Sequence, residues 1–449
     1  MRAYGAVVPR PAPTAAARSL LVVAVLGDVG WLLARPHLRG GANWAPLLAV
    51  LAVHAVLVGC ERRWRSLGAS EVFAAAAVVT VAAVALPLFG SRDLYAYAFS
   101  GRMVARYHAN PYFTAPTRFR HDPLLRSIAP PWRSTKTVYG PVFTLVSVLG
   151  AFGYRTSPLL ARLFFQGLEG VALLAGLRTL IARRVPTDVL VFLGLSPVVV
   201  AVVNGGHSDL LAGVLLMAGA IRLDERRTTS AGILLGAALL VKLLVAPGLL
   251  LVLSATALRR ADGGRVAALR AVTIVGAMTV VGYAAVGGPG ALRPLTTAGQ
   301  AISRGSVWRG IRQLLLDHHP TTALSVASAQ HLAGLTIGLL GLLLLWRTRR
   351  WDVAAAAGVA GILVVLLASQ YVLPWYSAMA LPLACVAPGR WRVLAQAQAA
   401  LLMVVYVTPP GHLVRSVPGL VQVTNLAMVL EVALLVAVVA VDRVVDAHR

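Results

Sequence analysis

The chain has 449 residues, of which 58% are hydrophobic and only 13% charged, and its mean hydropathy is +0.77. Soluble domains carry roughly 25% charged residues, so this composition excludes a water-soluble protein and indicates an integral membrane protein. The chain has 41 Lys and Arg residues and 16 Asp and Glu residues, which gives a net charge of +25. In a soluble protein this excess would suggest nucleic-acid binding, but in a membrane protein it is explained by basic cytoplasmic loops.

Apolar runs about long enough to cross a bilayer, at roughly 20 residues per helix, recur along the chain. The first run, 19–34, is interrupted by Asp28 and no clear small-residue cleavage site follows it, so we interpret it as a retained helix and not as a signal peptide. We expect 229–258 to be two short helices meeting near Lys242, and 138–153 not to cross fully. The other runs cover 44–60, 71–90, 158–181, 187–204, 208–221, 267–288, 326–346, 352–369, 374–387, 393–408 and 418–441.

Basic residues gather in every second loop between these runs. Because cytoplasmic loops collect Arg and Lys, the alternation predicts a multi-pass protein of the plasma (inner) membrane with both termini in the cytoplasm and about 12 to 14 crossings. We expect a single membrane domain over 1–449, with N-terminal extra helices at 1–70, a core at 71–390 and C-terminal helices at 391–449. The clusters are Arg62, Arg63 and Arg65; Arg183 and Arg184; Arg222, Arg226 and Arg227; Arg259, Arg260 and Arg265; Arg347, Arg349 and Arg350; Arg390 and Arg392; and Arg443 and Arg449.

The polar segments on the opposite, extracytoplasmic face are the longer ones. Residues 91–137 carry eight cations against the positive-inside bias, which indicates an anionic ligand or anionic lipid headgroups at the outer surface. A second large loop covers 289–325, and both large loops are expected to carry short amphipathic helices. Two short turns, NGGHSD at 204–209 and SQYVLPWY at 369–376, fall on the same face, so we expect the reactive groups there.

Asp93 follows the third apolar run, where a helix meets the outer water. A carboxylate at a bilayer edge is partly desolvated and still within reach of a polar substrate, which suits a general base acting on a sugar hydroxyl. The alternative is an N-cap of the amphipathic stretch 94–107, and the two interpretations are compatible. Nearby Arg92, Arg102 and Arg106 either hold a phosphate or bind ordinary lipid headgroups.

His207 and Asp209 stand two residues apart at the outer end of the fifth run. Together with Asp93 they would make a metal site of imidazole and carboxylates, but no metal-binding spacing accompanies them. We therefore expect Ser and Asp of this turn to cap the next helix, with Asp209 also lining the site, and we expect no metal.

Lys242 lies in an otherwise apolar stretch, where a charge costs about 2.5–3.5 kcal/mol on insertion scales. It is therefore expected to face a cavity or a partner. We favour a lipid phosphate as that partner, because no carboxylate stands at adjacent helical spacing. The structural alternatives are Asp28 and Glu169, which lie inside other apolar runs.

Aromatic and basic side chains occur together in the outer loops, a combination that suits a sugar face beside a phosphate. The alternative is that these rings anchor the protein at the membrane interface, which is the usual role of Trp and Tyr there. Tyr95, close to Asp93, is a further candidate contact. The other candidates are Arg304, Trp308 and Arg309 in the second large loop, and Tyr371, Trp375 and Tyr376 in the turn at 369–376.

Five segments alternate with the apolar runs in the order RDLYAYAFSGRMVARYHANPY, APPWRSTKTVYGPVF, SPVVVAVVNGGHSDLLAGVLLMAG, ALLVKLLVAPGLLLV and QYVLPWYSAMALPL. In this order they resemble the actinobacterial polyprenol-phosphate-mannose-dependent alpha-mannosyltransferases of the GT-C superfamily. The resemblance implies an all-α polytopic fold of GT-C type, with Asp93 as the catalytic base of the first outer loop. It also implies that Tyr139 lies at the rim of the site, with Gly140 and Pro141, and that the turn of His207 and Asp209 forms a second wall.

The chain has no nucleotide-binding signature, neither GxxxxGK[ST] nor a convincing GxGxxG after a strand. With the resemblance, this predicts an inverting glycosyltransferase that moves mannose from a polyprenyl-phosphate sugar donor to a cell-envelope glycan or glycolipid acceptor, without a cofactor. Its expected partners are these substrates and membrane lipids, and not nucleic acid. Two alternatives stay open: transfer of another lipid-phosphate sugar such as arabinose or glucose, and a lipid or sugar transporter or flippase, although we see no convincing internal repeat.

Overall fold

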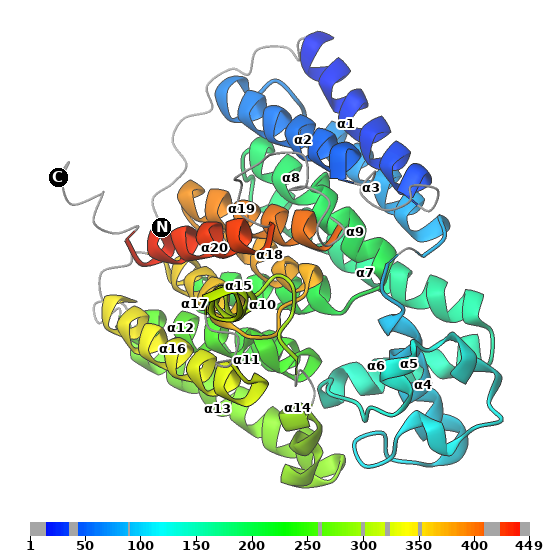
Figure 1. The fold of residues 1–449 in the computed structure, drawn as a ribbon. Helices are drawn as coiled ribbons and strands as arrows, with labels where there is room; N and C mark the ends of the chain where they lie inside the picture. The colour runs from blue at the N-terminus through cyan, green and yellow to red at the C-terminus, as the bar shows by residue number, and fades with distance from the viewer. Residues whose placement is uncertain are drawn as a thin grey trace.

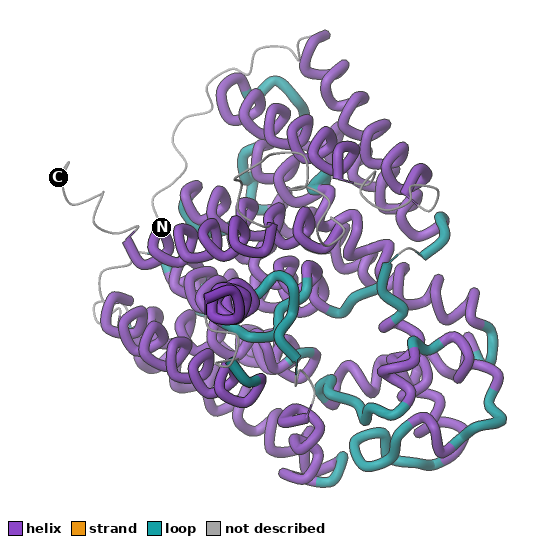
Figure 2. Tube along the Cα trace, viewed as in Figure 1, coloured by secondary structure: helices purple, strands orange, loops and turns teal. Residues whose placement is uncertain are grey.

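The computed structural model describes residues 15–35, 44–88, 90–258, 263–297, 301–318, 324–348, 353–407 and 423–440. Within these ranges the chain forms helices joined by loops and no strand, as Figure 2 shows, which confirms the predicted all-α fold. Five of the described helices are long and apolar enough to cross a membrane, and one bent pair of helices would make a sixth. The total of about 12 to 14 crossings stays a prediction.

The first half of the chain holds three of these candidate spans, α1, α2 and α7. The shorter α3 packs against α1 and α7, and α4 and α6 form a pair beside α7 (Figure 1). The helices of this half are α1 (Ala15–Ala34), α2 (Trp44–Trp64), α3 (Ala69–Ala85), α4 (Asp93–Tyr107), α5 (Pro130–Arg133), α6 (Pro141–Tyr154), α7 (Pro158–Ala182), α8 (Thr187–Gly194), α9 (Pro197–Gly205) and α10 (Asp209–Asp224).

The second half holds the other two candidate spans, α13 and α16. Their apolar windows are only 28% and 17% buried, as expected of helices that face lipid. α17, by contrast, is buried along its whole length between α12, α16 and α18. The helices of this half are α11 (Thr228–Val241), α12 (Ala246–Leu258), α13 (Gly264–Ala285), α14 (Arg293–Thr297), α15 (Val307–His318), α16 (Val326–Arg347), α17 (Ala354–Ala368), α18 (Ala380–Ala384), α19 (Gly389–Val407) and α20 (Val423–Ala440).

Two of the predicted apolar runs are broken helices. Pro197 begins α9, and α8 and α9 meet at a bend of 41°; proline at the first helical position lacks only an N–H that would be unpaired anyway. The run 229–258 breaks where predicted: α11 ends at Val241, Lys242 has an extended backbone (φ −151°, ψ 114°), and the 3₁₀ helix η5 (Leu243–Val245) leads into α12. A break leaves backbone groups unpaired inside the bundle, so other parts of the chain must satisfy them.

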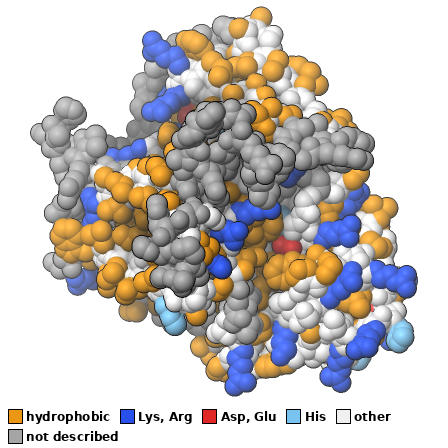
Figure 3. Space-filling model, viewed as in Figure 1, with side chains coloured by type: hydrophobic (Ala, Val, Ile, Leu, Met, Phe, Trp, Pro, Cys, Tyr) orange, Lys and Arg blue, Asp and Glu red, His pale blue; other side chains and the backbone are white. Residues whose placement is uncertain are grey.

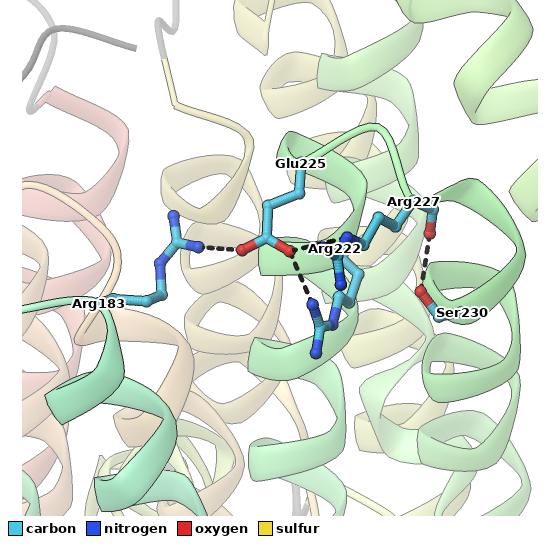
Figure 4. A network of polar contacts seen from close by, with 5 residues as sticks. All are labelled: Arg183, Arg222, Glu225, Arg227 and Ser230. Atoms are coloured by element: carbon cyan, nitrogen blue, oxygen red, sulfur yellow. Dashed lines mark hydrogen bonds and ion pairs between the residues drawn. The ribbon is translucent and has the colours of Figure 1, made fainter.

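Several predicted basic loops lie together at one end of the bundle. Glu225, just after α10, binds Arg183 from the loop after α7 and Arg222 at 2.9 Å, as Figure 4 shows. At the same end Thr187 donates to the buried carboxylate of Glu61 at 2.9 Å. Because α10 runs from Asp209 to this end, its first residue lies at the opposite end of the bundle, with the predicted reactive turns.

The predicted outer segment 91–137 folds into α4, two 3₁₀ turns and α5, which cover one side of the molecule (Figure 1). Gly101 of α4 lies so close to α6 that a Cβ there would come within 2.0 Å of the Ser147 carbonyl oxygen, so this helix pair requires glycine. On the face drawn in Figure 3, Lys and Arg side chains are prominent over this region and acidic ones are sparse. The predicted cluster of basic side chains over 91–137 is therefore present on the surface, and its place outside the membrane stays a prediction.

Candidate active site

Two cavities meet at Asp93. The first, of about 400 Å³, lies between α4, the loop before α6 and the break at Lys242. The second, of about 480 Å³, lies between the loop before α4, the end of α9 and the turn at 369–376. Asp93, Trp132, Tyr371 and Leu373 line both cavities, so they form the wall that the two share.

Asp93 is the first residue of α4, and its side chain is 6% exposed. The turn that precedes it contains Gly90 with φ +87°, a conformation that glycine adopts without strain. Arg92 stands at the N-cap and Asp93 at the first helical position, so the N-cap interpretation of Asp93 is wrong. The Asp93 backbone N–H donates to Ser91 Oγ at 3.1 Å, and the Ser91 and Trp132 side chains lie close enough to its carboxylate to influence its pKa.

Burial of Asp93 raises its pKa above the ordinary aspartate value, because desolvation disfavours the ionised form. The Ser91 side chain, the positive charge of Lys242 and the Trp132 side chain all act in the opposite direction and favour the carboxylate. A carboxyl group with a raised pKa binds a proton more readily than a solvated one, which suits a group that must accept a proton during a reaction.

Two lysines, Lys136 and Lys242, line the first cavity, and Lys242 is the one at the broken helix, where it is 8% exposed. Its ammonium donates to Asp209 Oδ1 at 2.7 Å and lies 4.2 Å from the centre of the Tyr376 ring and 5.6 Å from that of Tyr139. The partner of Lys242 is thus neither Asp28 nor Glu169, which were the structural alternatives. Lys242 is 33 residues away from Asp209 in the sequence, and the two side chains meet because α11 ends just before Lys242.

The predicted Tyr-Gly-Pro rim docks onto this break. The Gly140 N–H donates to the Val241 carbonyl at 3.2 Å, and a Cβ on Gly140 would come within 2.0 Å of the Leu240 carbonyl oxygen. Pro141 then begins α6. The motif therefore satisfies a carbonyl that the broken helix leaves without an intrahelical partner, and it fixes Tyr139 beside Lys242.

The second cavity has an aromatic wall. His207 and Trp375 stack with ring centres 4.1 Å apart and planes 7° apart, and the Tyr97 hydroxyl lies 3.4 Å from His207 Nδ1. Tyr139 donates to the Tyr97 hydroxyl at 2.9 Å, so a chain of polar contacts connects the two cavities beneath their shared wall. Arg92 and Arg35 contribute positive charge to this second cavity.

The turn around His207 is held by the asparagine that precedes it. The Asn204 side-chain amide donates to the Ala83 carbonyl at 2.9 Å and to the Pro87 carbonyl at 3.2 Å. Ala83 lies in the last turn of α3, and Pro87 lies in the loop that leads to Asp93. Gly206 adopts φ +61° and lets the chain turn back toward α10. The Asn-Gly-Gly-His segment therefore sets the position of both His207 and the loop that carries Asp93.

The turn at 369–376 is braced by the second predicted outer loop. Ser303 Oγ accepts from the Val372 N–H at 2.9 Å, and Ser306 Oγ donates to the Ser369 carbonyl at 2.8 Å. The Trp308 indole donates to the Ala368 carbonyl at 2.7 Å and is 9% exposed. Trp308 is therefore a buried packing residue that lines neither cavity, and the loop acts by supporting Tyr371, Trp375 and Tyr376.

The structure brings eight of the fourteen predicted site residues to the cavities and places six elsewhere. Arg102 forms an ion pair with Asp122, which also accepts from Tyr107 at 2.7 Å. Asp209 is fully buried behind Lys242, and Ser208 makes no capping bond. Those outside both cavities are Tyr95, Arg102, Asp209, Arg304, Trp308 and Arg309; those lining a cavity are Arg92, Asp93, Tyr139, His207, Lys242, Tyr371, Trp375 and Tyr376.

Three residues that sequence reasoning missed also belong to the site: Trp132, Tyr97 and Arg35. Tyr97 stands one helical turn after Asp93 on α4, so the i, i+4 spacing was a usable signal for it. Trp132 and Arg35 lie far from Asp93 in sequence and carry no such signal. Across the described residues, no group of three His, Cys, Asp or Glu side chains is arranged to hold a metal ion.

Comparison with known proteins identifies the family of the chain. The family described as Alpha-(1->6)-mannopyranosyltransferase, N-terminal domain, matches residues 16–258, which is more than half of the chain. The chain is also similar to Alpha-(1->6)-mannopyranosyltransferase A of Mycobacterium tuberculosis (strain ATCC 25618 / H37Rv), with 30% identity over 341 residues. That match covers 71% of this chain and 64%, less than two thirds, of the relative. No solved structure matches. The chain therefore belongs to the alpha-(1->6)-mannopyranosyltransferase family.

Proposed function

We propose that this protein is an inverting mannosyltransferase that takes mannose from a polyprenyl phosphate and delivers it to a cell-envelope glycan or glycolipid on the extracytoplasmic face. The family and the activity in the name of the mycobacterial relative support mannose transfer. One observation carries the proposal: Asp93 lies in the shared wall of two cavities. A proton acceptor placed between two binding sites suits a reaction that joins two substrates.

In this scheme the donor sugar occupies the first cavity and the acceptor occupies the second. Asp93 accepts the proton of an acceptor hydroxyl while that oxygen attacks the anomeric carbon. The bond between the anomeric carbon and the phosphate oxygen breaks, and the polyprenyl phosphate leaves with the electron pair. Because the attack comes from the side opposite the leaving group, the configuration at the anomeric carbon inverts.

The first cavity is the better donor site because its features match the three parts of a lipid-phosphate sugar. The Lys242 ammonium offers positive charge to the phosphate as negative charge grows on it, and such electrostatic stabilisation often contributes more to catalysis than any other effect. Leu243, Leu244 and Leu295 continue the wall with apolar surface that suits an isoprenoid chain. Tyr139 and Tyr376 offer rings and hydroxyls to the sugar.

The second cavity suits a polar acceptor. The stacked pair of His207 and Trp375 offers a flat aromatic surface, and Arg92 and Arg35 offer hydrogen-bond donors at the cavity wall. Small-molecule sites commonly combine apolar or aromatic walls with a few well-placed polar groups, and both cavities have this composition.

Transfer from a defined donor tests the proposal. Purified protein in liposomes is given radiolabelled polyprenyl-phosphate mannose and a short alpha-linked mannoside, and we expect label in an elongated mannoside. Matched donors carrying glucose or arabinose on the same lipid should give less product. If no donor yields product while the liposomes accumulate lipid-linked or free sugar, the protein is a transporter and the proposal is wrong.

The rate should depend on pH through Asp93. Only the ionised carboxylate accepts a proton, so kcat/KM should fall as the pH drops through the raised pKa of Asp93, at a pH above the ordinary aspartate range. Trp132→Phe removes the indole that favours the carboxylate, so this pKa rises further and the acid limb moves to higher pH. The measurement is the pH profile of mannose transfer by the two proteins.

A matched control is Trp64→Phe, because Trp64 is 59% exposed at the end of α2 and lines neither cavity. Its profile should coincide with that of the unmodified protein. An acid limb that stays in place in Trp132→Phe would show that the indole does not act on the base.

A further inference from the structure

Asp209 is a buried carboxylate that the proposed reaction does not use directly. It is the first residue of α10, has no exposed surface and lines neither cavity. Its Oδ1 accepts from Lys242 Nζ at 2.7 Å, and within the described residues its Oδ2 has no hydrogen-bond partner. Asp209 therefore binds the ammonium group of Lys242 from outside the first cavity, which Lys242 lines.

Lys242 needs such a partner because its side chain is long and its backbone is not helical. A lysine ammonium sits on a flexible four-carbon stem, so its position is set by its contacts. Asp209 holds the ammonium by a charge-assisted hydrogen bond, and Tyr376 and Tyr139 offer their ring faces to it. An ammonium has three N–H donors, so two remain for a ligand or for the rings.

Asp209 itself is fixed from behind. The Leu211 N–H, in the first turn of the same helix, donates to Glu169 Oε2 of α7 at 3.1 Å. Gly213, one turn further along α10, lies against the backbone of residues 378–379. A Cβ on Gly213 would come within 2.8 Å of the Ala378 and Met379 carbonyl oxygens. The start of α10 is therefore clamped between α7 and the segment that follows Tyr376, and it presents Asp209 to Lys242 from a rigid base.

We propose that Asp209 is a positioning residue: it acts through Lys242, holding the ammonium at the floor of the first cavity where the phosphate of the donor arrives. This inference rests on the proposed function, because it needs a phosphate donor in that cavity. It assigns Asp209 no contact with either substrate. Loss of Asp209 should therefore weaken donor binding and should have no effect once Lys242 is gone.

A double-mutant cycle tests the inference. Asp209→Asn keeps the size of the side chain and an oxygen acceptor but loses the charge, and it should raise KM for the polyprenyl-phosphate mannose donor by about tenfold, with a smaller change in kcat. Lys242→Met should raise the same KM by at least as much. In the double variant the loss should equal that of Lys242→Met alone, since the two residues form one unit.

The control separates this role from a general need for a buried ion pair. Asp188 and Arg392 form another partly buried pair, at 3.3 Å, at the opposite end of the bundle and outside both cavities. Asp188→Asn should lower the melting temperature without changing the donor KM. A donor KM that is also unchanged in Asp209→Asn, or losses that add in the double variant, would overturn the inference.

A reversed pair keeps the test valid if the single variants fold poorly. Asp209→Lys combined with Lys242→Asp restores opposite charges, and we expect it to recover folding and not donor affinity, because the cation is then behind the cavity. Recovery of donor affinity would overturn the inference. Transfer by the unmodified protein is measured in parallel: its absence defeats the proposed function, whereas normal transfer with unaltered KM in Asp209→Asn defeats only this inference.

Discussion

Replacing Asp93 with asparagine is expected to lower the rate of mannose transfer by about 10²–10⁴-fold, the usual contribution of a general base. Asparagine fits the same space between the two cavities and keeps an oxygen beside Ser91 and Trp132, but it does not accept a proton at neutral pH. Donor binding should be nearly unchanged, because Lys242 and the apolar wall of the first cavity are retained. The measurement is kcat for transfer together with donor KM.

Stability should change in the opposite direction in Asp93→Asn. Because burial raises the Asp93 pKa in the fold, the ionised group destabilises the folded protein at a pH above that pKa, and asparagine removes this cost. The melting temperature at neutral pH should therefore be equal or higher, and the difference should vanish as the pH falls below the unfolded aspartate pKa. Asp188→Asn, at the other end of the bundle, is the matched control and should retain transfer. Normal transfer in Asp93→Asn would end the base assignment.

Gly140→Ala should be the second most damaging change. The added methyl group would come within 2.0 Å of the Leu240 carbonyl oxygen and 2.4 Å of its carbon, which are backbone atoms and do not move aside as a flexible side chain does. The loop must lift off the break, so Tyr139 shifts and the Val241 carbonyl loses its donor. Overpacking of this kind costs about 1–3 kcal/mol, and a displacement of the site by an ångström costs about 10²-fold in rate.

The same helix provides the control for this glycine. Gly153, near the end of α6, has no atom within 4 Å of where a Cβ would lie. Gly153→Ala should therefore leave transfer unchanged and stabilise the helix by about 0.5–1 kcal/mol. Melting temperature and transfer rate are compared for both variants. If Gly140→Ala behaves like Gly153→Ala, the contact with the broken helix does not matter for the site.

The all-α class, the break at Lys242 and the position of Asp93 at the end of an apolar run were predictable because they depend on local patterns, whereas Tyr95 was chosen and Tyr97 lines the cavity. Apolar runs of helical length specify helices in a membrane, and a lysine within such a run requires a special environment. Asp93 was identifiable because the change from apolar to polar sequence marks a membrane edge. In each case the signal lies within about 20 residues of the feature it predicts.

Contacts between distant helices account for what the sequence did not reveal. The pairing of Lys242 with Asp209 depends on how α10 and the broken helix lie side by side, and no spacing rule relates them. Arg102 was expected to hold phosphate, yet the fold of the outer loop brings Asp122 to it. Trp132 reaches Asp93 for the same kind of reason: a long segment that is polar in sequence folds back over the start of α4.

The contribution of Arg35 to the second cavity has a consequence for protein engineering. Arg35 follows α1 directly, and its guanidinium carbon lies 5.1 Å from the centre of the Trp31 ring. It lines the second cavity together with His207 and Trp375. A truncated chain that begins at α3 would keep Asp93, Lys242 and every other residue that lines the two cavities. It would lose Arg35 from the wall of the second cavity. A shortened chain that keeps every residue of both cavities therefore has to include Arg35, together with Trp31 of α1, over which its guanidinium lies.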